Sequence, residues 1–209
     1  MSAIETEGVI LAAGRSSRTA PDCKLVFRLA GRTMLERSVE SMRPFCARIY
    51  VVTGAHAETV ADILRGREGV LLVHNPDFAA GMYGSVKAGL RRTHADKVFV
   101  LPGDCPLVEP GVYAALLAAD GEIVLPEWKG RAGHPVLLNR SVIPALLRDE
   151  ACESLRQFIA AYGSTRVAVD CPGILTDIDT VEAYKIALER LTGGECDETR
   201  GGSGRSIRL

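Results

Sequence analysis

The sequence predicts a single-domain, three-layer α/β/α fold around a mostly parallel sheet. Short apolar runs rich in Val, Ile and Leu alternate along the 209 residues with segments of helical periodicity. The runs end at turn residues, and their alternation with helices favours right-handed βαβ crossovers. At this length roughly 70% of the unfolded chain's surface can be buried, so a complete core needs no disulfide or metal. We expect one domain over residues 1–192.

Seven segments are expected to form strands. The first four are the most apolar and are expected to be buried on both faces. In chain order the strands are 8–13, 48–54, 69–75, 97–104, 122–128, 134–139 and 165–171. Ligands of such sheets bind beyond the carboxyl ends of the strands. One functional rim is therefore expected from the loops at 12–24, 75–85, 102–106 and 126–135.

The helices carry start and end signals. Thr33 and Glu36 form a capping box before an apolar stripe, and Pro110 suits a first helical turn. Ser141 and Thr180 are expected to cap two later helices. The expected helices cover 33–44, 57–65, 82–92, 110–116, 142–147, 155–159 and 180–191. In the third of these, Met82, Val86 and Leu90 recur on one face.

Composition excludes several classes of protein. The formal net charge is −1, from 25 basic and 26 acidic side chains, so no nucleic-acid or anionic-membrane partner is expected. No segment approaches the ~20 apolar residues that span a bilayer. The six cysteines include no CxxC pair, which fits neither a zinc site nor a stapled scaffold. Any phosphate binding must therefore come from a local loop.

Both ends of the chain support further expectations. Residues 1–8 carry acidic groups where a secretion signal has basic ones, so we expect a reduced, cytoplasmic compartment. Residues 193–209 contain five glycines and few apolar side chains, which predicts a disordered tail. Cys23 and Cys105 lie beside charged residues at the rim, and we interpret them as small packing residues rather than redox or metal groups.

The first predicted strand leads into a loop suited to phosphate. Small residues at Ala12, Ala13 and Gly14 let a ligand approach backbone N–H groups. Three cations surround them, Arg15, Arg18 and Lys24. The spacing matches neither the P-loop nor GxGxxG. Basic residues in polar loops are usually solvated, but three of them beside small residues after a buried strand favour phosphate binding.

Two acidic sites follow later strands. Asp104, in LPGDCP, stands where a strand ends and can hold a hard cation against phosphate oxygens. The alternative is an aspartate that satisfies turn backbone. Asp177 and Asp179, in LTDIDT, are expected on one side of an extended segment and form the second acidic site. The alternative is that they only provide favourable charge at a helix N-terminus.

The loop LAAGRSSR…K is similar to the signature loop of nucleotidyltransferases with a Rossmann-like, nucleotide-diphospho-sugar transferase fold. The resemblance implies that the loop wraps a triphosphate and that Arg15, Arg18 and Lys24 stabilise charge on the α-phosphate and pyrophosphate. It also implies Mg²⁺ held by Asp104 and Asp179. The chain departs from the family at 19–21, Thr-Ala-Pro, where a glycine often follows the second arginine.

Two further motifs resemble those of molybdenum cofactor cytidylyltransferases. They are HNPDFAAGMYGSVKAGL (74–90) and GHPVLL (133–138), within a resemblance over residues 7–191. It implies that the nucleotide is bound by Leu11, Ala12, Ala13, Gly14, Asn75, Gly81 and Ser85. It also implies that His134 contacts a molybdopterin-type acceptor, with Arg156 as a nearby anchor whose planar fork suits phosphate. Alternatively, His134 only enters a strand and Arg156 is solvated.

These features lead to one favoured function and several alternatives. We favour transfer of CMP from CTP, with GTP as the second choice of nucleotide, onto a molybdopterin-type acceptor. A molybdenum hydroxylase or its insertion chaperone is a further implied partner. The alternatives are a sugar-phosphate or polyol-phosphate nucleotidyltransferase and a non-catalytic carrier of the molybdenum cofactor. Retention of Lys24 and both aspartates favours an enzyme.

Overall fold

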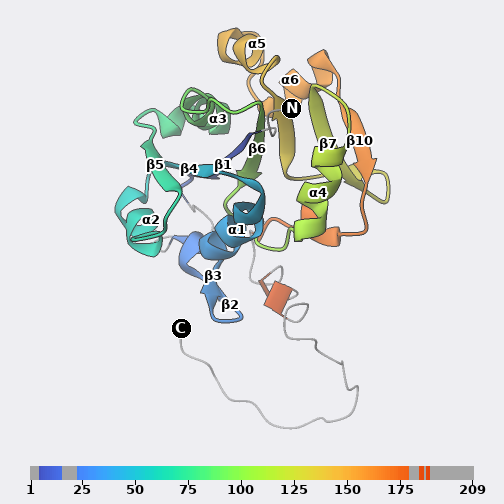
Figure 1. The fold of residues 1–209 in the computed structure, drawn as a ribbon. Coiled ribbons are helices and arrows are strands. Elements are labelled where there is room, and N and C mark those ends of the chain that lie inside the picture. The colour runs from blue at the N-terminus through green and yellow to red at the C-terminus, as the bar shows by residue number, and fades with distance from the viewer. Residues whose placement is uncertain (1–4, 16–22, 179–183, 186, 189–209) are drawn as a thin grey trace, which may run out of the picture.

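A computed structural model describes residues 5–15, 23–178, 184–185 and 187–188. An eight-stranded sheet lies between two layers of helices (Figure 1). Its strands are β1 (Thr6–Ala12), β4 (Arg48–Thr53), β5 (Val70–His74), β6 (Lys97–Pro102), β7 (Ile123–Trp128), β8 (Arg131–Ala132), β9 (Val136–Asn139) and β10 (Thr165–Ala168). The predicted Rossmann-like α/β fold is confirmed.

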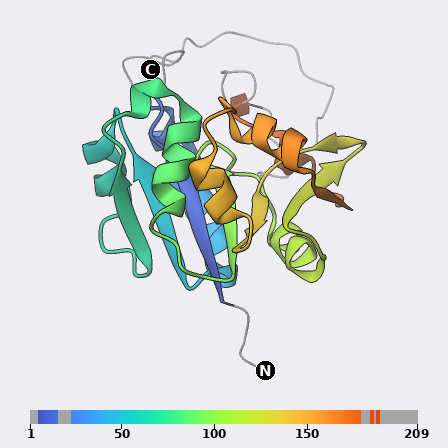
Figure 2. The ribbon, with the colours of Figure 1, turned by 90° about the horizontal axis from the view of Figure 1, so that it is seen from above.

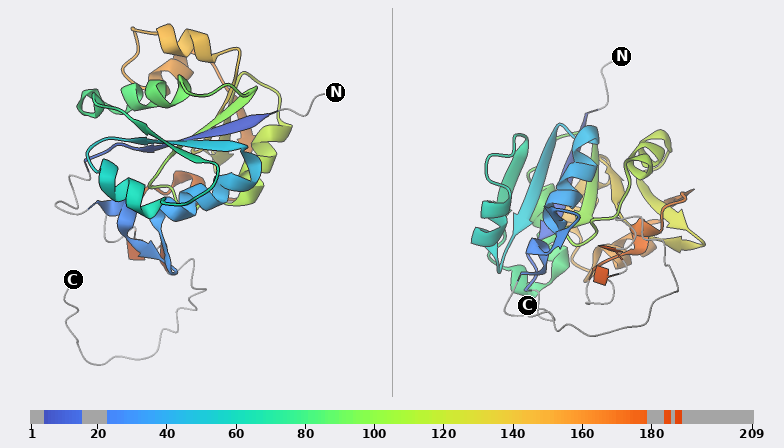
Figure 3. Two further views of the ribbon diagram at one scale, coloured as in Figure 1. Left: turned by 60° about the vertical axis from the view of Figure 1, so that its left-hand side comes forward. Right: turned by 90° about the horizontal axis from the view of Figure 1, so that it is seen from below.

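Helices cover both faces of this sheet. They are α1 (Met34–Met42), α2 (Ala57–Ile63), α3 (Met82–Leu90), α4 (Pro110–Ala118), α5 (Ile143–Arg148) and α6 (Leu155–Tyr162). Helices α1, α2 and α4 lie on one face and α3, α5 and α6 on the other, and the left view of Figure 3 shows the sheet between them. Single 3₁₀ turns are η1 (Lys24–Val26), η2 (Arg43–Phe45), η3 (Phe78–Ala80) and η4 (Pro172–Leu175).

Two apolar cores follow from this layering. Strand residues alternate between the faces, so Ile10 joins the core beneath α1 and Val9 joins the core beneath α3. Tyr113 of α4 is fully buried and packs edge-on against Phe99 of β6. Each face of the sheet is therefore covered by its own helices, and the ends of the strands carry the loops.

The strand order is β10-β7-β9-β6-β1-β4-β5, with β8 paired to β7. β1 pairs in parallel with both β4 and β6, whereas β9 runs antiparallel to β6 and β7. From β1 the chain proceeds to β4 and β5 on one side, then returns to β6 on the other. This change of direction is the switch point at which ligands bind in open α/β sheets.

Several local expectations hold in detail. The capping box forms: the Glu36 amide donates to Thr33 Oγ1 at 3.1 Å, and the Thr33 amide donates to Glu36 Oε2 at 2.7 Å. Pro110 opens α4 as predicted. A short hairpin, β2 (Arg28–Leu29) and β3 (Arg32–Thr33), precedes α1 and was not predicted.

Three expectations are wrong. β5 is an edge strand with Leu71 and Leu72 about half exposed, so it is not buried on both faces. Met82 is 65% exposed, and Tyr83 faces the core in its place. Ser141 does not cap α5, because its hydroxyl donates to Glu122 Oε1 at 2.7 Å. The expected cap Thr180 and the tail at 193–209 lie outside the described residues.

Candidate functional site

Several loops meet where the parallel strands end. In Figure 2 these strands run from the edge at which β1 begins toward the opposite edge. There the Gly103 amide donates to the Leu11 carbonyl at 2.9 Å, which ties the loop after β6 to the end of β1. A Cβ on Gly103 would lie only 3.1 Å from that carbonyl oxygen, so the close approach favours glycine. The two loops thus meet at one edge of the sheet.

An ion pair joins two of the predicted residues across this rim. Lys24 Nζ lies 2.5 Å from Asp104 Oδ2, and each side chain is 18% exposed. η1 presents Lys24, with Leu25 buried beneath it, and Asp104 follows the last residues of β6. Residues separated by 80 positions thus place a cation and a carboxylate together, partly accessible to solvent.

The predicted phosphate loop starts beside this pair. Ala12 and Ala13 are buried at the end of β1, and Gly14 and Arg15 are exposed. The Ala55 amide donates to the Ala13 carbonyl at 3.3 Å. No atom of the residues that the structure describes lies within 4 Å of a Cβ built on Gly14. Arg18 lies outside the described residues.

The segment after β5 has its own internal bonds. Asn75 and Ser85 are buried, and Asn75 Nδ2 donates to Ser85 Oγ at 3.0 Å. The Asp77 amide donates to Asn75 Oδ1 at 3.1 Å. Gly81 then adopts φ 121°, a conformation that favours glycine, and α3 begins at the next residue. Asn75 and Ser85 therefore fix the shape of this segment from beneath.

His134 lies near Asp104, two residues before β9 begins. Its amide donates to the Ile174 carbonyl at 2.9 Å, and its Nδ1 is buried with no hydrogen-bond partner among the described residues. Burial lowers the pKa of the imidazole, although the carboxylates of Asp104 and Asp177 act in the opposite direction. Burial thus favours the neutral form of the ring.

The loop that carries His134 is pressed against η4. A Cβ on Gly133 would collide with the Ile174 carbonyl, and one on Gly173 would collide with the Leu107 carbonyl. Both positions therefore require glycine. The Ile178 amide donates to the Asp104 carbonyl at 3.1 Å, so the segment after η4 also reaches the Asp104 loop. The His134 loop, η4 and the segment after η4 are thus packed against the loop that carries Asp104.

Not every predicted residue is placed in this group. Asp177 is exposed, and its charge tends to raise the pKa of His134. Asp179 lies outside the described residues. Arg156 is exposed on α6, and it makes no hydrogen bond or ion pair with another residue that the structure describes. The structure therefore unites Lys24, Asp104 and His134 and leaves Arg156 as a solvated side chain.

Three residues with contacts at the rim were not predicted from the sequence. The guanidinium carbon of Arg15 lies 5.6 Å from the centroid of the Phe78 ring. His56 Nε2 lies 3.3 Å from the Arg15 carbonyl. Gly54 sits where a Cβ would be 2.6 Å from the Ala13 carbonyl oxygen and 2.7 Å from the Phe78 side chain. Phe78 lies in the HNPDF motif and Arg15 in the predicted phosphate loop, but the contact between them was not predicted.

Other expectations concern cysteines, metals and membranes. Among the described residues, Cys23, Cys46, Cys105, Cys152 and Cys171 form no disulfide. Cys23 and Cys105 are buried in the core beneath α1, as packing residues are. No three His, Cys, Asp or Glu side chains of the described residues gather as a metal cluster. None of the described helices is long and apolar enough to cross a membrane.

Comparison with known proteins agrees with this geometry. The family described as MobA-like NTP transferase domain matches residues 8–167. The chain is 30% identical over 194 residues to the molybdenum cofactor cytidylyltransferase of Escherichia coli K12, covering 92% of this chain and 99% of that protein. It is 28% identical to a molybdenum cofactor guanylyltransferase of Shewanella sp. ANA-3, covering 86% of this chain and 93% of that protein.

A solved structure gives the same result. Rv0371c from Mycobacterium tuberculosis H37Rv superposes with a TM-score of 0.76 at 25% identity, covering 90% of this chain and all of that one. The family match spans the phosphate loop, the Asp104 loop and His134. The chain belongs to the family of MobA-like NTP transferase domains and is a nucleotidyltransferase.

Proposed function

We propose that this enzyme transfers CMP from CTP to a phosphate of a molybdopterin-type cofactor and releases pyrophosphate. The observation that carries the proposal is the Lys24–Asp104 pair at the switch point of the sheet, together with the exposed Gly14 at the end of β1. The E. coli relative that this chain matches over nearly its whole length bears the name of that activity. The proposed domain covers residues 1–192.

The reaction is an in-line displacement. An oxygen of the acceptor phosphate attacks the α-phosphorus, a new P–O bond forms, and the bond from the α-phosphorus to the bridging oxygen breaks so that pyrophosphate leaves. Such a transfer depends on positioning and charge neutralisation, not on a protein nucleophile. Lys24 and Arg15 offset the charge that develops at the α-phosphate, and Arg18 holds the β- and γ-phosphates. The backbone N–H groups of residues 11–14 face the triphosphate.

The donor set fits a magnesium ion. Asp104 supplies a partly exposed carboxylate at the rim, and Asp179 is the proposed second ligand. Magnesium in phosphoryl-transfer sites is held by one or two carboxylates plus substrate phosphates and keeps several waters, so a dense protein cluster is not required. When bound, the ion neutralises phosphate charge between the two substrates. Lys24 forms an ion pair with the same carboxylate and thereby positions Asp104 for this role.

The acceptor is proposed to lie on the His134 side. Burial favours the neutral imidazole, its buried Nδ1 has no hydrogen-bond partner among the described residues, and the ring lies close enough to Asp104 for that carboxylate to raise its pKa. An acceptor phosphate or pterin carbonyl beside the ring would therefore also be close to the α-phosphate. Arg156 is the proposed outer anchor because it is exposed and its planar guanidinium can hold a phosphate through two parallel hydrogen bonds. The product would pass to a molybdenum hydroxylase or its insertion chaperone.

GTP is the second candidate nucleotide. Relatives named molybdenum cofactor guanylyltransferase match most of this chain at 28% identity, close to the 30% of the cytidylyltransferase. Residues 11–14 and 75–81 offer mainly backbone groups, which do not distinguish bases by side-chain type. The choice of CTP therefore rests on the relative with the highest identity among these.

One assay tests the proposal. Pyrophosphate release is measured with each of the four ribonucleoside triphosphates, against molybdopterin-type cofactor, a sugar phosphate and a polyol phosphate. We expect release with the pterin acceptor and CTP. Release with a sugar or polyol phosphate alone would move the enzyme to another substrate class. Binding of the cofactor without release under any condition would indicate a carrier.

A further inference from the structure

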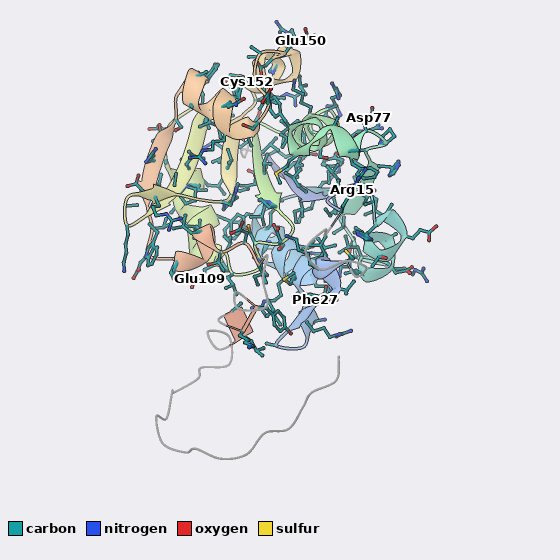
Figure 4. All side chains as sticks on the ribbon, turned by 180° about the vertical axis from the view of Figure 1, so that it is seen from behind. Arg15, Phe27, Asp77, Glu109, Glu150 and Cys152 are labelled. Carbon is teal, nitrogen blue, oxygen red and sulfur yellow. The ribbon has the colours of Figure 1, made fainter. Side chains whose placement is uncertain are left out.

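The side chain of Arg15, in the loop after β1, lies over an aromatic ring. Its guanidinium carbon is 5.6 Å from the centroid of Phe78, which is within the range of a cation–π contact. Arg15 is exposed and Phe78 is half-buried, packed on the core beneath α3. In Figure 4 Arg15 and Asp77, the residue before Phe78, lie on the same side of the molecule. The contact thus joins the loop after β1 to η3, which lies 63 residues later.

A second contact fixes the backbone of the same arginine. His56 Nε2 donates to the Arg15 carbonyl at 3.3 Å, which requires the tautomer with hydrogen on Nε2. One residue earlier, the Ala55 amide donates to the Ala13 carbonyl at 3.3 Å. The turn between β4 and α2 therefore holds the loop at two carbonyls, on either side of Gly14.

The ring itself cannot shift freely. Gly54 leaves no room for a side chain, because a Cβ there would be 2.7 Å from the Phe78 side chain and 2.6 Å from the Ala13 carbonyl oxygen. The Gly81 amide donates to the Phe78 carbonyl at 3.3 Å, which closes η3. Three segments that are distant in sequence therefore interlock beneath the arginine, at Ala13, Gly54 and Phe78.

We propose that Phe78 and His56 are positioning residues that hold Arg15 toward the triphosphate. This inference rests on the proposed function. A free arginine side chain loses considerable rotamer entropy when it binds phosphate, and a ring that already holds its guanidinium reduces that loss. Phe78 supplies the face, and His56 fixes the direction in which the side chain leaves the backbone. Neither residue touches the reacting atoms.

A double-mutant cycle on nucleotide binding tests this role. CTP with magnesium, and GTP in parallel, are titrated calorimetrically into the full-length chain without acceptor, so that no turnover occurs. The variants are Phe78→Leu, which keeps apolar volume but removes the ring, Phe78→Tyr, which keeps the ring face, and Arg15→Ala. Each Phe78 variant is also combined with Arg15→Ala. Tyr162→Leu, an aromatic replacement on α6 away from the loop, is the matched control. A melting curve accompanies each variant.

An exposed cation–π contact is worth a factor of about 2 to 5 in an equilibrium constant. We expect Phe78→Leu to weaken triphosphate binding by that factor, Phe78→Tyr to restore it, and Phe78→Leu to have no effect once Arg15 is alanine. Equal weakening with and without Arg15 would overturn the role, because ring loss would then act through the fold. Unchanged binding in Phe78→Leu would overturn it as well.

His56 provides an independent pair of variants if the ring change unfolds the protein. His56→Ala should weaken binding, and His56→Gln, whose amide can donate to the same carbonyl, should recover it. Failure of Gln to recover what Ala loses would overturn the part assigned to His56. Nucleotide binding with no coupling to Arg15 would overturn this inference alone. No binding of either nucleotide by the parent chain would overturn the proposed function with it.

Discussion

Replacing Lys24 with alanine separates the chemistry of the rim from its stability. The Nζ–Oδ2 distance to Asp104 is 2.5 Å, and both side chains are 18% exposed. At that distance the attraction is about 2 kcal/mol in a water-like dielectric. Ordering of the long side chain offsets part of it, as in other exposed pairs, so we expect a net loss of about 1 kcal/mol. For a chain of this size, that lowers Tm by about 2–4 °C.

The effect on turnover is expected to be far larger. Removal of a preorganised group that stabilises developing charge slows reactions by ~10²–10³-fold. Pyrophosphate release should therefore fall at least ~10²-fold while the circular dichroism spectrum matches that of the parent. Lys24→Arg is a matched control that keeps the charge but changes the geometry, and it should retain more activity than alanine does. Near-parental turnover in Lys24→Ala would remove Lys24 from the mechanism.

Three further results are expected. Alanine at Asp104 or Asp179 should raise the magnesium concentration for half-maximal rate, and the double variant should be no worse than the poorer single one. Strictly multiplicative losses of rate would mean that the two residues have independent roles. His134→Ala should raise the KM for the acceptor and leave calorimetric CTP affinity unchanged; the reverse pattern would place the acceptor elsewhere. The hydrogen bond from Tyr83 holds the pKa of Asp149 below its ordinary value, so this carboxylate stabilises the fold above its unfolded pKa and loses that effect as pH falls. Tm measured from pH 7 to pH 3 should therefore fall less steeply in Asp149→Asn, and parallel curves would contradict that assignment.

The elements of the fold were predictable because their signals are local. Capping at Thr33 and the apolar run before Ala12 depend on neighbours in sequence, and both appear where expected. The position of a strand within the sheet is not local. GVLLVHN is as apolar as a central strand, yet β5 lies at the edge and exposes Leu71 and Leu72. Apolar character alone does not show which strands have two neighbours.

The site was predictable to the same extent. Lys24 comes after β1 and Asp104 comes after β6. Because β1 and β6 are parallel neighbours, their carboxyl ends lie at the same edge of the sheet, so the meeting of the two side chains follows from the topology. The contact of Arg15 with the Phe78 ring depends on the space beside Gly54, which has no side chain. A glycine in a turn has many uses, and only coordinates show which side chain fills the space beside it. His134 was expected near a ligand, but its proximity to Asp104 appears only in the folded chain.

Transfer of a labelled α-phosphate tests the central claim most directly. CTP and GTP that carry ³²P at the α-position are incubated separately with the enzyme, magnesium and molybdopterin-type cofactor, and the label is followed by chromatography. We predict that label from CTP moves to the cofactor in step with pyrophosphate release, and that Lys24→Ala and Asp104→Ala abolish the transfer. Label that stays with the nucleotide, or moves only to a sugar phosphate, would contradict the account.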